Sequence, residues 1–124
     1  KGRTIGLLGL SFKPNTDDLR DAPSLTIAQQ LIKMGAEVRV YDPVAMDACR
    51  NQHPELEVTY AESLLDLATK SDALVLVTEW EEFKRANWNE IGAVMRWPLV
   101  IDGRNSLPEE DVKLAGFTYR GIGR

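Results

Sequence analysis

Short apolar runs recur along the chain, and between them lie stretches in which apolar residues return every three to four positions. Runs of four to eight apolar and β-branched residues are typical of strands, whereas the longer period is typical of amphipathic helices. The runs predict five strands and a small sixth strand at an edge, at Thr4–Leu10, Glu37–Tyr41, Glu57–Tyr60, Ala73–Thr78, Leu99–Asp102 and Phe117–Tyr119. The periodic stretches predict helices from Pro23 up to Gly35, over Val44–Arg50, over Ala61–Thr69, within Trp80–Trp97 and over Glu109–Ala115.

The alternation of strands and helices indicates βαβ units, which have parallel strands and right-handed crossovers. We therefore predict an α/β fold, a three-layer Rossmann-like sandwich with a mostly parallel sheet of five to six strands in the order 3-2-1-4-5-6. Ala73–Thr78 is the most hydrophobic run and is placed centrally. Ligands bind such sheets at the carboxyl ends of the strands, where the strand order reverses. Four segments follow strand ends there, namely Gly9–Pro23, Asp42-Pro43, Thr78–Trp80 and Asp102–Asn105.

The composition indicates one globular domain over residues 1–124, since domains commonly have about 100–200 residues. Its apolar share of 44% and charged share of 27% argue against disorder. A net charge of −4 without a basic stripe argues against a nucleic-acid partner. The longest apolar run, Ala73–Val77, is far shorter than the roughly 20 residues of a membrane span, so we expect no membrane association. Lys1–Arg3 leads directly into the first strand, so no signal peptide is expected, and the single cysteine suggests a reducing, cytoplasmic location.

Few residues are available for metal binding or nucleophilic catalysis. Cys49 and His53 are the single cysteine and the single histidine, too few for a Cys/His zinc site. His53 lies in the polar stretch Asn51–Pro54, and we interpret it as an exposed turn residue. Cys49 lies in a predicted helix, where a small packed thiol is commoner than a nucleophile. We therefore expect no metal site and no catalytic residue in this chain.

The loop after the first strand departs from the dinucleotide-binding fingerprint. That fingerprint, G-x-G-x-x-G, lets the backbone approach a pyrophosphate at a helix N-terminus. Here Ser11 replaces the second glycine and Pro14 the third. Asp42 stands in the place of a ribose-binding acid, but about thirty residues on instead of about 20, and Asp before Pro is also an ordinary turn signal. A self-contained NAD site is therefore disfavoured, although it stays an alternative.

The same loop is longer than the 2–6 residues usual for such a connection, and long ordered loops tend to be functional. Lys13 comes just past the strand end, where its ammonium group can meet a phosphate. Arg20 is a second cation, flanked by Asp17, Asp18 and Asp21, whose charges can fix its guanidinium group. The alternative is a solvated loop whose charges compensate one another.

Arg104 follows the fifth strand and Trp80 the fourth, at the same predicted edge of the sheet. Gly103 permits a sharp exit from the strand, so Arg104 is expected to point along the ligand-binding edge. Its planar group suits phosphate, ribose or a base carbonyl, and the alternative is a surface ion pair with Asp102. Trp80 either stacks on a base or packs against the following helix, and packing is favoured.

These segments together resemble a known protein family. Gly9–Ser24, Tyr41–Pro43, Val77–Trp80, Asp102–Asn105 and Tyr119–Arg124 occur in the order found in the C-terminal domain of the UDP-glucose/GDP-mannose dehydrogenase family. The similarity covers essentially the whole chain and is strongest to the bacterial members that act on UDP-glucose. The resemblance implies that the chain is the UDP-binding domain of a longer enzyme.

The resemblance also implies roles for individual residues. Lys13, after Phe12, matches the family lysine that helps to hold the nucleotide sugar, so both residues are assigned to the substrate. Arg104 matches the arginine that contacts the UDP part. Arg20 matches an arginine that reaches toward NAD. The family's NAD fingerprint and catalytic cysteine have no counterpart here, and Cys49 lies in the wrong segment to replace that cysteine.

The whole enzyme implied by the resemblance oxidises UDP-glucose to UDP-glucuronate in two NAD-dependent steps. NAD is then bound mainly by N-terminal and central domains absent here, and the intact enzyme is expected to be a homodimer or larger. A relative acting on UDP-N-acetylmannosamine or GDP-mannose is an alternative, as is a non-catalytic interaction module. Four large side chains, Trp80, Phe83, Trp88 and Trp97, are many for a small domain, and some are expected to cover surface that the other domains hide.

Overall fold

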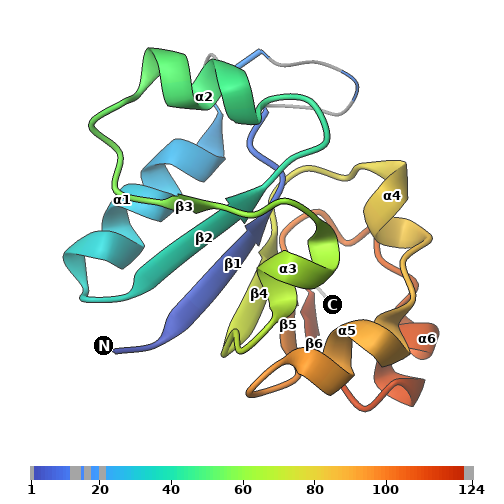
Figure 1. Ribbon diagram of the computed structural model, residues 1–124. Helices are drawn as coiled ribbons and strands as arrows, with labels where there is room; N and C mark the ends of the chain where they lie inside the picture. Colours follow the sequence, from blue (N-terminus) through green and yellow to red (C-terminus); the bar gives the residue numbers. More distant parts are fainter. Residues whose placement is uncertain (1, 12–14, 16–17, 20–21, 122–124) are drawn as a thin grey trace.

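The computed structural model is a six-stranded parallel sheet between two layers of helices, and it describes residues 2–11, 15, 18–19 and 22–121 (Figure 1). The strands are β1 (Thr4–Leu8), β2 (Glu37–Tyr41), β3 (Thr59–Tyr60), β4 (Ala73–Leu76), β5 (Leu99–Asp102) and β6 (Thr118–Gly121). Their order is β3-β2-β1-β4-β5-β6, with every neighbouring pair parallel. The predicted fold class and strand order are confirmed, and the hydrophobic β4 lies at the centre beside β1.

The helices are α1 (Pro23–Lys33), α2 (Met46–Gln52), α3 (Leu64–Ala68), α4 (Glu81–Lys84), α5 (Trp88–Val94) and α6 (Glu109–Leu114). Helices α1 and α2 cover one face of the sheet, and α3, α5 and α6 cover the other (Figure 1). In the described part of the chain, no helix is both long enough and apolar enough to span a membrane.

Each face of the sheet has its own hydrophobic core, because successive side chains of a strand point to opposite faces. Leu7 of β1 belongs to the cluster under α1 and α2, together with Val40. Leu8 belongs to the cluster under α3, α5 and α6, together with Leu74. All four side chains are buried. A strand covered on both faces needs apolar residues at consecutive positions, which explains the adjacent leucines Leu7 and Leu8 of β1 and the wholly apolar sequence of β4.

The helical stretch predicted within Trp80–Trp97 contains two short helices, α4 and α5. The backbone of Asn87 is extended, and its side chain accepts a hydrogen bond from the Glu90 backbone nitrogen at 3.2 Å. An asparagine in this position satisfies a free N–H group at the start of a helix, so it begins α5 as a separate element.

Of the four large side chains among which some were expected to cover surface hidden by other domains, three are part of the core. Trp80, Phe83 and Trp88 are 7%, 0% and 4% exposed, whereas Trp97 is 55% exposed. The Trp88 ring meets Phe117 edge-on, with ring centroids 5.3 Å apart. Of the four, only Trp97 is exposed enough to contribute to a surface that other domains would hide.

Candidate functional site

Four loops leave the sheet at the same edge. Leu8 is paired with Tyr41 on one side and with Leu76 on the other, and Leu76 is paired with Asp102. The carboxyl ends of β2, β1, β4 and β5 are therefore level, and they include the point where the strand order reverses. This is where an open parallel sheet binds ligands. The segments selected from the sequence thus meet at one edge.

Asp42, at the end of β2, is fully buried and accepts hydrogen bonds from five N–H groups. Its Oδ2 accepts from the backbone of Leu10 at 2.7 Å and of Ser11 at 3.3 Å, and from Nε1 of Trp80 at 3.2 Å. Its Oδ1 accepts from the backbone of Val44 and Ala45, each at 2.8 Å. A buried carboxylate is tolerated when hydrogen bonds replace its water, and here they come from the loops after β1, β2 and β4.

This arrangement decides the role of Asp42. A ribose-binding acid must present its oxygens to the ligand, whereas both oxygens of Asp42 are buried and already accept hydrogen bonds. The N–H groups of Leu10 and Ser11, which could otherwise bind a phosphate, are directed at the carboxylate. Asp42 is therefore structural, and the described residues at this edge do not fit the dinucleotide site considered as an alternative.

The first residues after β1 are held from three sides. Gly9 has a φ of +100°, and a Cβ at this position would overlap the side chain of Thr78. The Thr78 hydroxyl donates to the Ser11 carbonyl at 2.6 Å, and the Ser24 hydroxyl donates to the Leu10 carbonyl at 2.5 Å. The loop thus starts from a fixed base. Phe12, Lys13 and Arg20, which the sequence assigns to substrate and cofactor, lie outside the described residues.

Asp102, at the end of β5, shapes the second loop of interest. Its Oδ1 accepts from the backbone of Arg104 at 3.0 Å, and its Oδ2 accepts from the backbone of Leu107 and the hydroxyl of Tyr119, each at 2.8 Å. A side chain at Gly103 would place its Cβ 2.7 Å from the carbonyl oxygen of Leu76, so glycine is required there. Together these contacts fix the backbone from which Arg104 projects.

The side chain of Arg104 pairs with Glu79, not with Asp102. Its Nε donates to Oε1 of Glu79 at 2.6 Å, and the two side chains are 36% and 33% exposed. The predicted alternative, an ion pair with Asp102, is wrong, because both oxygens of that buried carboxylate accept hydrogen bonds from the loop and from Tyr119. Arg104 lies at the predicted edge with its guanidinium group held by one contact.

Trp80 packs into the core, as favoured from the sequence. It is 7% exposed, lies in the cluster under α3, α5 and α6, and directs its indole nitrogen to Asp42. Its ring face is therefore not available for stacking on a base.

Cys49 and His53 show no sign of a catalytic arrangement. Cys49 is buried in α2, and burial raises the pKa of its thiol, which disfavours the nucleophilic thiolate. Burial also raises the pKa of Tyr60, whose hydroxyl lies 3.3 Å from the Cys49 sulfur. His53 is partly exposed and lies 3.5 Å from Glu55. Among the residues the structure describes, no cluster of three potential metal ligands occurs.

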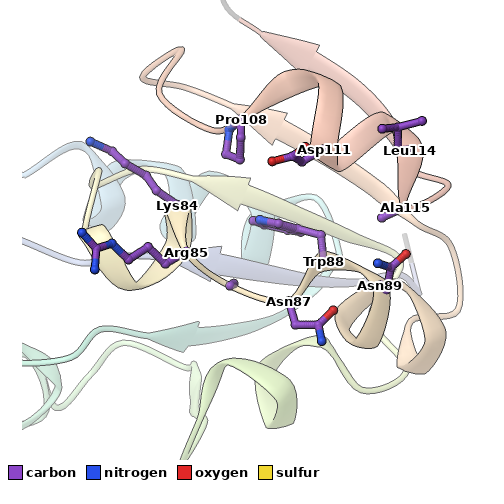
Figure 2. Close-up of a pocket in the computed structure, with 10 residues that line it drawn as sticks. Lys84, Arg85, Asn87, Trp88, Asn89, Pro108, Asp111, Leu114 and Ala115 are labelled. Atoms are coloured by element: carbon purple, nitrogen blue, oxygen red, sulfur yellow. The ribbon is translucent and has the colours of Figure 1, made fainter.

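A groove of about 550 Å³ lies away from this edge, in the outer layer formed by α4, α5 and α6. Figure 2 shows the Trp88 ring at its middle, between the residues of α4 and those of α6. The groove is lined by Lys84, Arg85, Ala86, Asn87, Trp88, Asn89, Pro108, Asp111, Leu114 and Ala115. Neither Arg104 nor Glu79 belongs to it, so it is separate from the predicted site.

The sequence placed Glu79 at this edge, within Thr78–Trp80, but gave it no role, and it did not place Tyr119 there. Glu79 comes three residues after the end of β4, and this place near a strand end was a usable signal. That its carboxylate meets a guanidinium group 25 residues further along the chain depends on the adjacency of β4 and β5. Tyr119 lies on the edge strand β6 and reaches Asp102, a contact that no local pattern indicates.

Comparisons with known proteins agree with this architecture. The model of the UDP-glucose/GDP-mannose dehydrogenase family, UDP binding domain, matches residues 6–109. A UDP-glucose 6-dehydrogenase of Pseudomonas aeruginosa is 44% identical over 100% of the chain, and one of Bacillus subtilis is 41% identical over 99%. The chain spans 28% of the length of each of these relatives.

Two solved structures are similar in both sequence and fold. A UDP-glucose dehydrogenase from Pyrobaculum islandicum superimposes with a TM-score of 0.79 at 33% identity, over 98% of this chain and 25% of that one. A UDP-D-ManNAc dehydrogenase from Pyrococcus horikoshii superimposes with a TM-score of 0.77 at 38% identity, over 99% of this chain and 26% of that one.

Proposed function

Because the chain belongs to the UDP-glucose/GDP-mannose dehydrogenase family, matching its UDP binding domain, we propose that residues 1–124 are the nucleotide-sugar-binding domain of a longer enzyme. The observation that carries this proposal is Arg104, held at the carboxyl edge of the sheet. Asp102 fixes its backbone at 3.0 Å and Glu79 fixes its Nε at 2.6 Å. An arginine held in this way is prepared to bind a ligand without further ordering, which lowers the entropic cost of binding.

The ligand is UDP linked to a sugar, with Arg104 and the loop of Phe12 and Lys13 as its contacts in this domain. Lys13 supplies an unbranched cation for phosphate, and Arg104 supplies a planar set of donors. The similarity to UDP-glucose 6-dehydrogenases favours UDP-glucose as the substrate and UDP-glucuronate as the product of the whole enzyme. The similarity to a UDP-D-ManNAc dehydrogenase favours, as a second candidate, the corresponding N-acetylmannosamine nucleotide. GDP-mannose is a third, because the family includes dehydrogenases of that sugar.

Catalysis belongs to parts of the enzyme outside this chain. The described residues do not fit NAD, because Asp42 is buried and its oxygens already accept hydrogen bonds. They do not supply a nucleophile either, because burial raises the pKa of the Cys49 thiol. NAD is bound mainly by the N-terminal and central domains, with Arg20 reaching toward it from this one. In this arrangement the domain binds the nucleotide and thereby orients the reacting sugar carbon at a distance. The intact enzyme is a cytoplasmic homodimer or larger assembly.

Calorimetric titration with UDP tests this proposal in the full-length enzyme and in this chain. The full-length enzyme is expected to bind UDP, and Lys13→Ala and Arg104→Ala are each expected to weaken binding. The chain alone binds more weakly, because part of the crevice is contributed by other domains. UDP binding that neither substitution changes in the full-length enzyme would refute the proposal. Tight NAD binding by the isolated chain, lost in Asp42→Ala, would instead establish a self-contained NAD domain.

A further inference from the structure

The free hydrogen-bond donors and acceptor of the Glu79–Arg104 pair indicate which part of a nucleotide it can bind. Nε of Arg104 is the only side-chain donor of this residue with a partner among the described residues. A guanidinium group has five N–H bonds, so the four on its two terminal nitrogens remain for a ligand. Oε2 of Glu79 also remains as an acceptor, since Oε1 makes the contact. The pair therefore presents donors and an acceptor side by side.

The pair also carries no net charge, because one carboxylate compensates one guanidinium group at 2.6 Å. On the β4 side, Glu81 and Glu82 of α4 are balanced by Lys84 and Arg85, so this segment adds no net positive charge beside the pair. Diphosphate carries concentrated negative charge and is favoured by uncompensated cations. The carbonyls of a base and the hydroxyls of ribose are neutral. A site for them needs hydrogen-bond donors and acceptors but no net charge.

We propose that Glu79 is a positioning residue that holds Arg104 by its Nε, and that the pair binds the uridine part of the ligand instead of its diphosphate. This inference rests on the proposed UDP binding. The Arg104 nitrogens donate to uridine oxygens, and the free Glu79 oxygen accepts from a ribose hydroxyl or from the base N–H. The charge of the diphosphate is then left to cations elsewhere in the site, of which Lys13 is the assigned one.

The two exits from the sheet make this geometry rigid. The Gly103 backbone nitrogen donates to the Leu76 carbonyl at 3.0 Å, so the loop after β5 is bonded to the last residue of β4. The Thr78 hydroxyl holds the residue before Glu79 to Ser11 at 2.6 Å. Both partners of the ion pair thus project from anchored backbone. Removing the Glu79 carboxylate leaves Arg104 free to rotate while its backbone stays in place.

The test uses the full-length enzyme and three probes, namely UDP, uridine and inorganic pyrophosphate, the last two measured by displacement of UDP. Glu79→Ala is expected to weaken the binding of UDP and of uridine by a similar factor, about three- to tenfold. The same substitution is expected not to weaken the binding of pyrophosphate. Glu79→Gln, which keeps an acceptor for Nε, is expected to recover much of the loss. In an Arg104→Ala background, Glu79→Ala is expected to cause a smaller further loss than in the unsubstituted enzyme, because only the direct contact of Glu79 with the ribose or the base is then removed. Glu81→Ala, which removes an equal charge that pairs with Lys84 and Arg85, is the matched control and is expected to leave all three probes unchanged.

Three results would overturn the inference. Tighter UDP binding by Glu79→Ala would show that Glu79 competes with the ligand for Arg104. Equal losses of uridine and pyrophosphate binding in Arg104→Ala would place Arg104 on the diphosphate. Unchanged uridine binding in Glu79→Ala would remove the positioning role. Failure of the unsubstituted enzyme to bind UDP is a different result, because it ends the proposed function before any variant is compared.

Discussion

The indole nitrogen of Trp80 donates a hydrogen bond to Oδ2 of Asp42 at 3.2 Å, and this contact joins the exit of β4 to the end of β2 across the end of β1. The same oxygen accepts from the backbone of Leu10 at 2.7 Å. A single buried carboxylate thus holds three neighbouring loops at the edge where the ligand site is proposed. The aromatic residue that follows β4 acts here as a structural donor.

Asp42→Asn is expected to lower the free energy of unfolding by about 2–4 kcal/mol. The amide offers one acceptor oxygen where the carboxylate offers two, and its NH₂ group faces N–H donors. Urea unfolding of the chain measures the change. Asp47→Asn, an exposed acid of α2 that pairs with Arg50 at 3.0 Å, is the matched control and should cost less than about 1 kcal/mol. Equal effects of the two substitutions would contradict the structural role of Asp42.

Gly9 and Gly116 allow backbone strain to be separated from steric overlap. Both have positive φ, +100° and +96°, but a Cβ at Gly9 overlaps Thr78 whereas nothing lies within 4 Å of one at Gly116. Gly116→Ala is expected to lower the free energy of unfolding by about 1–2 kcal/mol, because alanine disfavours a positive φ. Gly9→Ala adds the overlap with a buried side chain and is expected to cost at least about 3 kcal/mol. Thermal unfolding compares the two, and similar losses would show that the approach of Thr78 to Gly9 is not tight.

Much of the fold could be predicted from the sequence, because the apolar runs that form the two-faced core are short and well separated. β2 and β5 have the predicted bounds, and the strand order is that of the Rossmann-like architecture which the alternation of strands and helices indicates. The break between α4 and α5 was not predicted, although Asn87, with Glu90 three residues later, is a helix-start signal. The closely spaced large apolar residues of Trp80–Trp97 are compatible with one longer helix and obscure that signal.

The details of the site could be predicted only where they depend on strand ends. That Arg104 lies at the ligand-binding edge follows from its position after β5. Its pairing with Glu79 and the bonding of Asp42 depend on side-chain directions across adjacent strands. Spacing along the chain does not contain that information. It made Asp42 a candidate ribose ligand and Asp102 a candidate ion-pair partner of the Arg104 side chain, and neither interpretation agrees with the structure.

Tyr41 provides a prediction for alkaline pH. Burial and then the hydrogen bond to Glu82 raise the pKa of this phenol from 10.0 to about 12. Between these two values the folded chain keeps a proton that the unfolded chain has lost, so the free energy of unfolding falls as the pH rises through this range. Tyr41→Phe lacks this contribution. Urea midpoints measured from pH 9 to 12 should fall less steeply in Tyr41→Phe than in the unsubstituted chain, and parallel curves would contradict the assignment.

The two loop cations, Lys13 and Arg20, are predicted to act on different ligands in the full-length enzyme. Lys13→Ala should weaken UDP binding and leave NAD use nearly intact, and Arg20→Ala should do the reverse. Loss of a charge-assisted hydrogen bond to phosphate costs about 1.5–3 kcal/mol, or about ten- to hundredfold in the affected constant. Calorimetry with UDP and steady-state kinetics with varied NAD measure the two effects. Equal losses of UDP affinity in both variants would show that the division is wrong.

Binding of UDP at the carboxyl edge of the sheet is tested most directly by mapping where UDP binds on this chain, from backbone amide and indole NMR shifts during a UDP titration. We expect the shifts to concentrate at the carboxyl edge of the sheet, at Gly9–Ser11, Glu79 and Gly103–Asn105. Trp88, in the groove between the outer helices, should keep its indole shift and serves as an internal control. Shifts concentrated around Trp88, with the resonances of Glu79 and Arg104 unchanged at saturating UDP, would contradict the central claim.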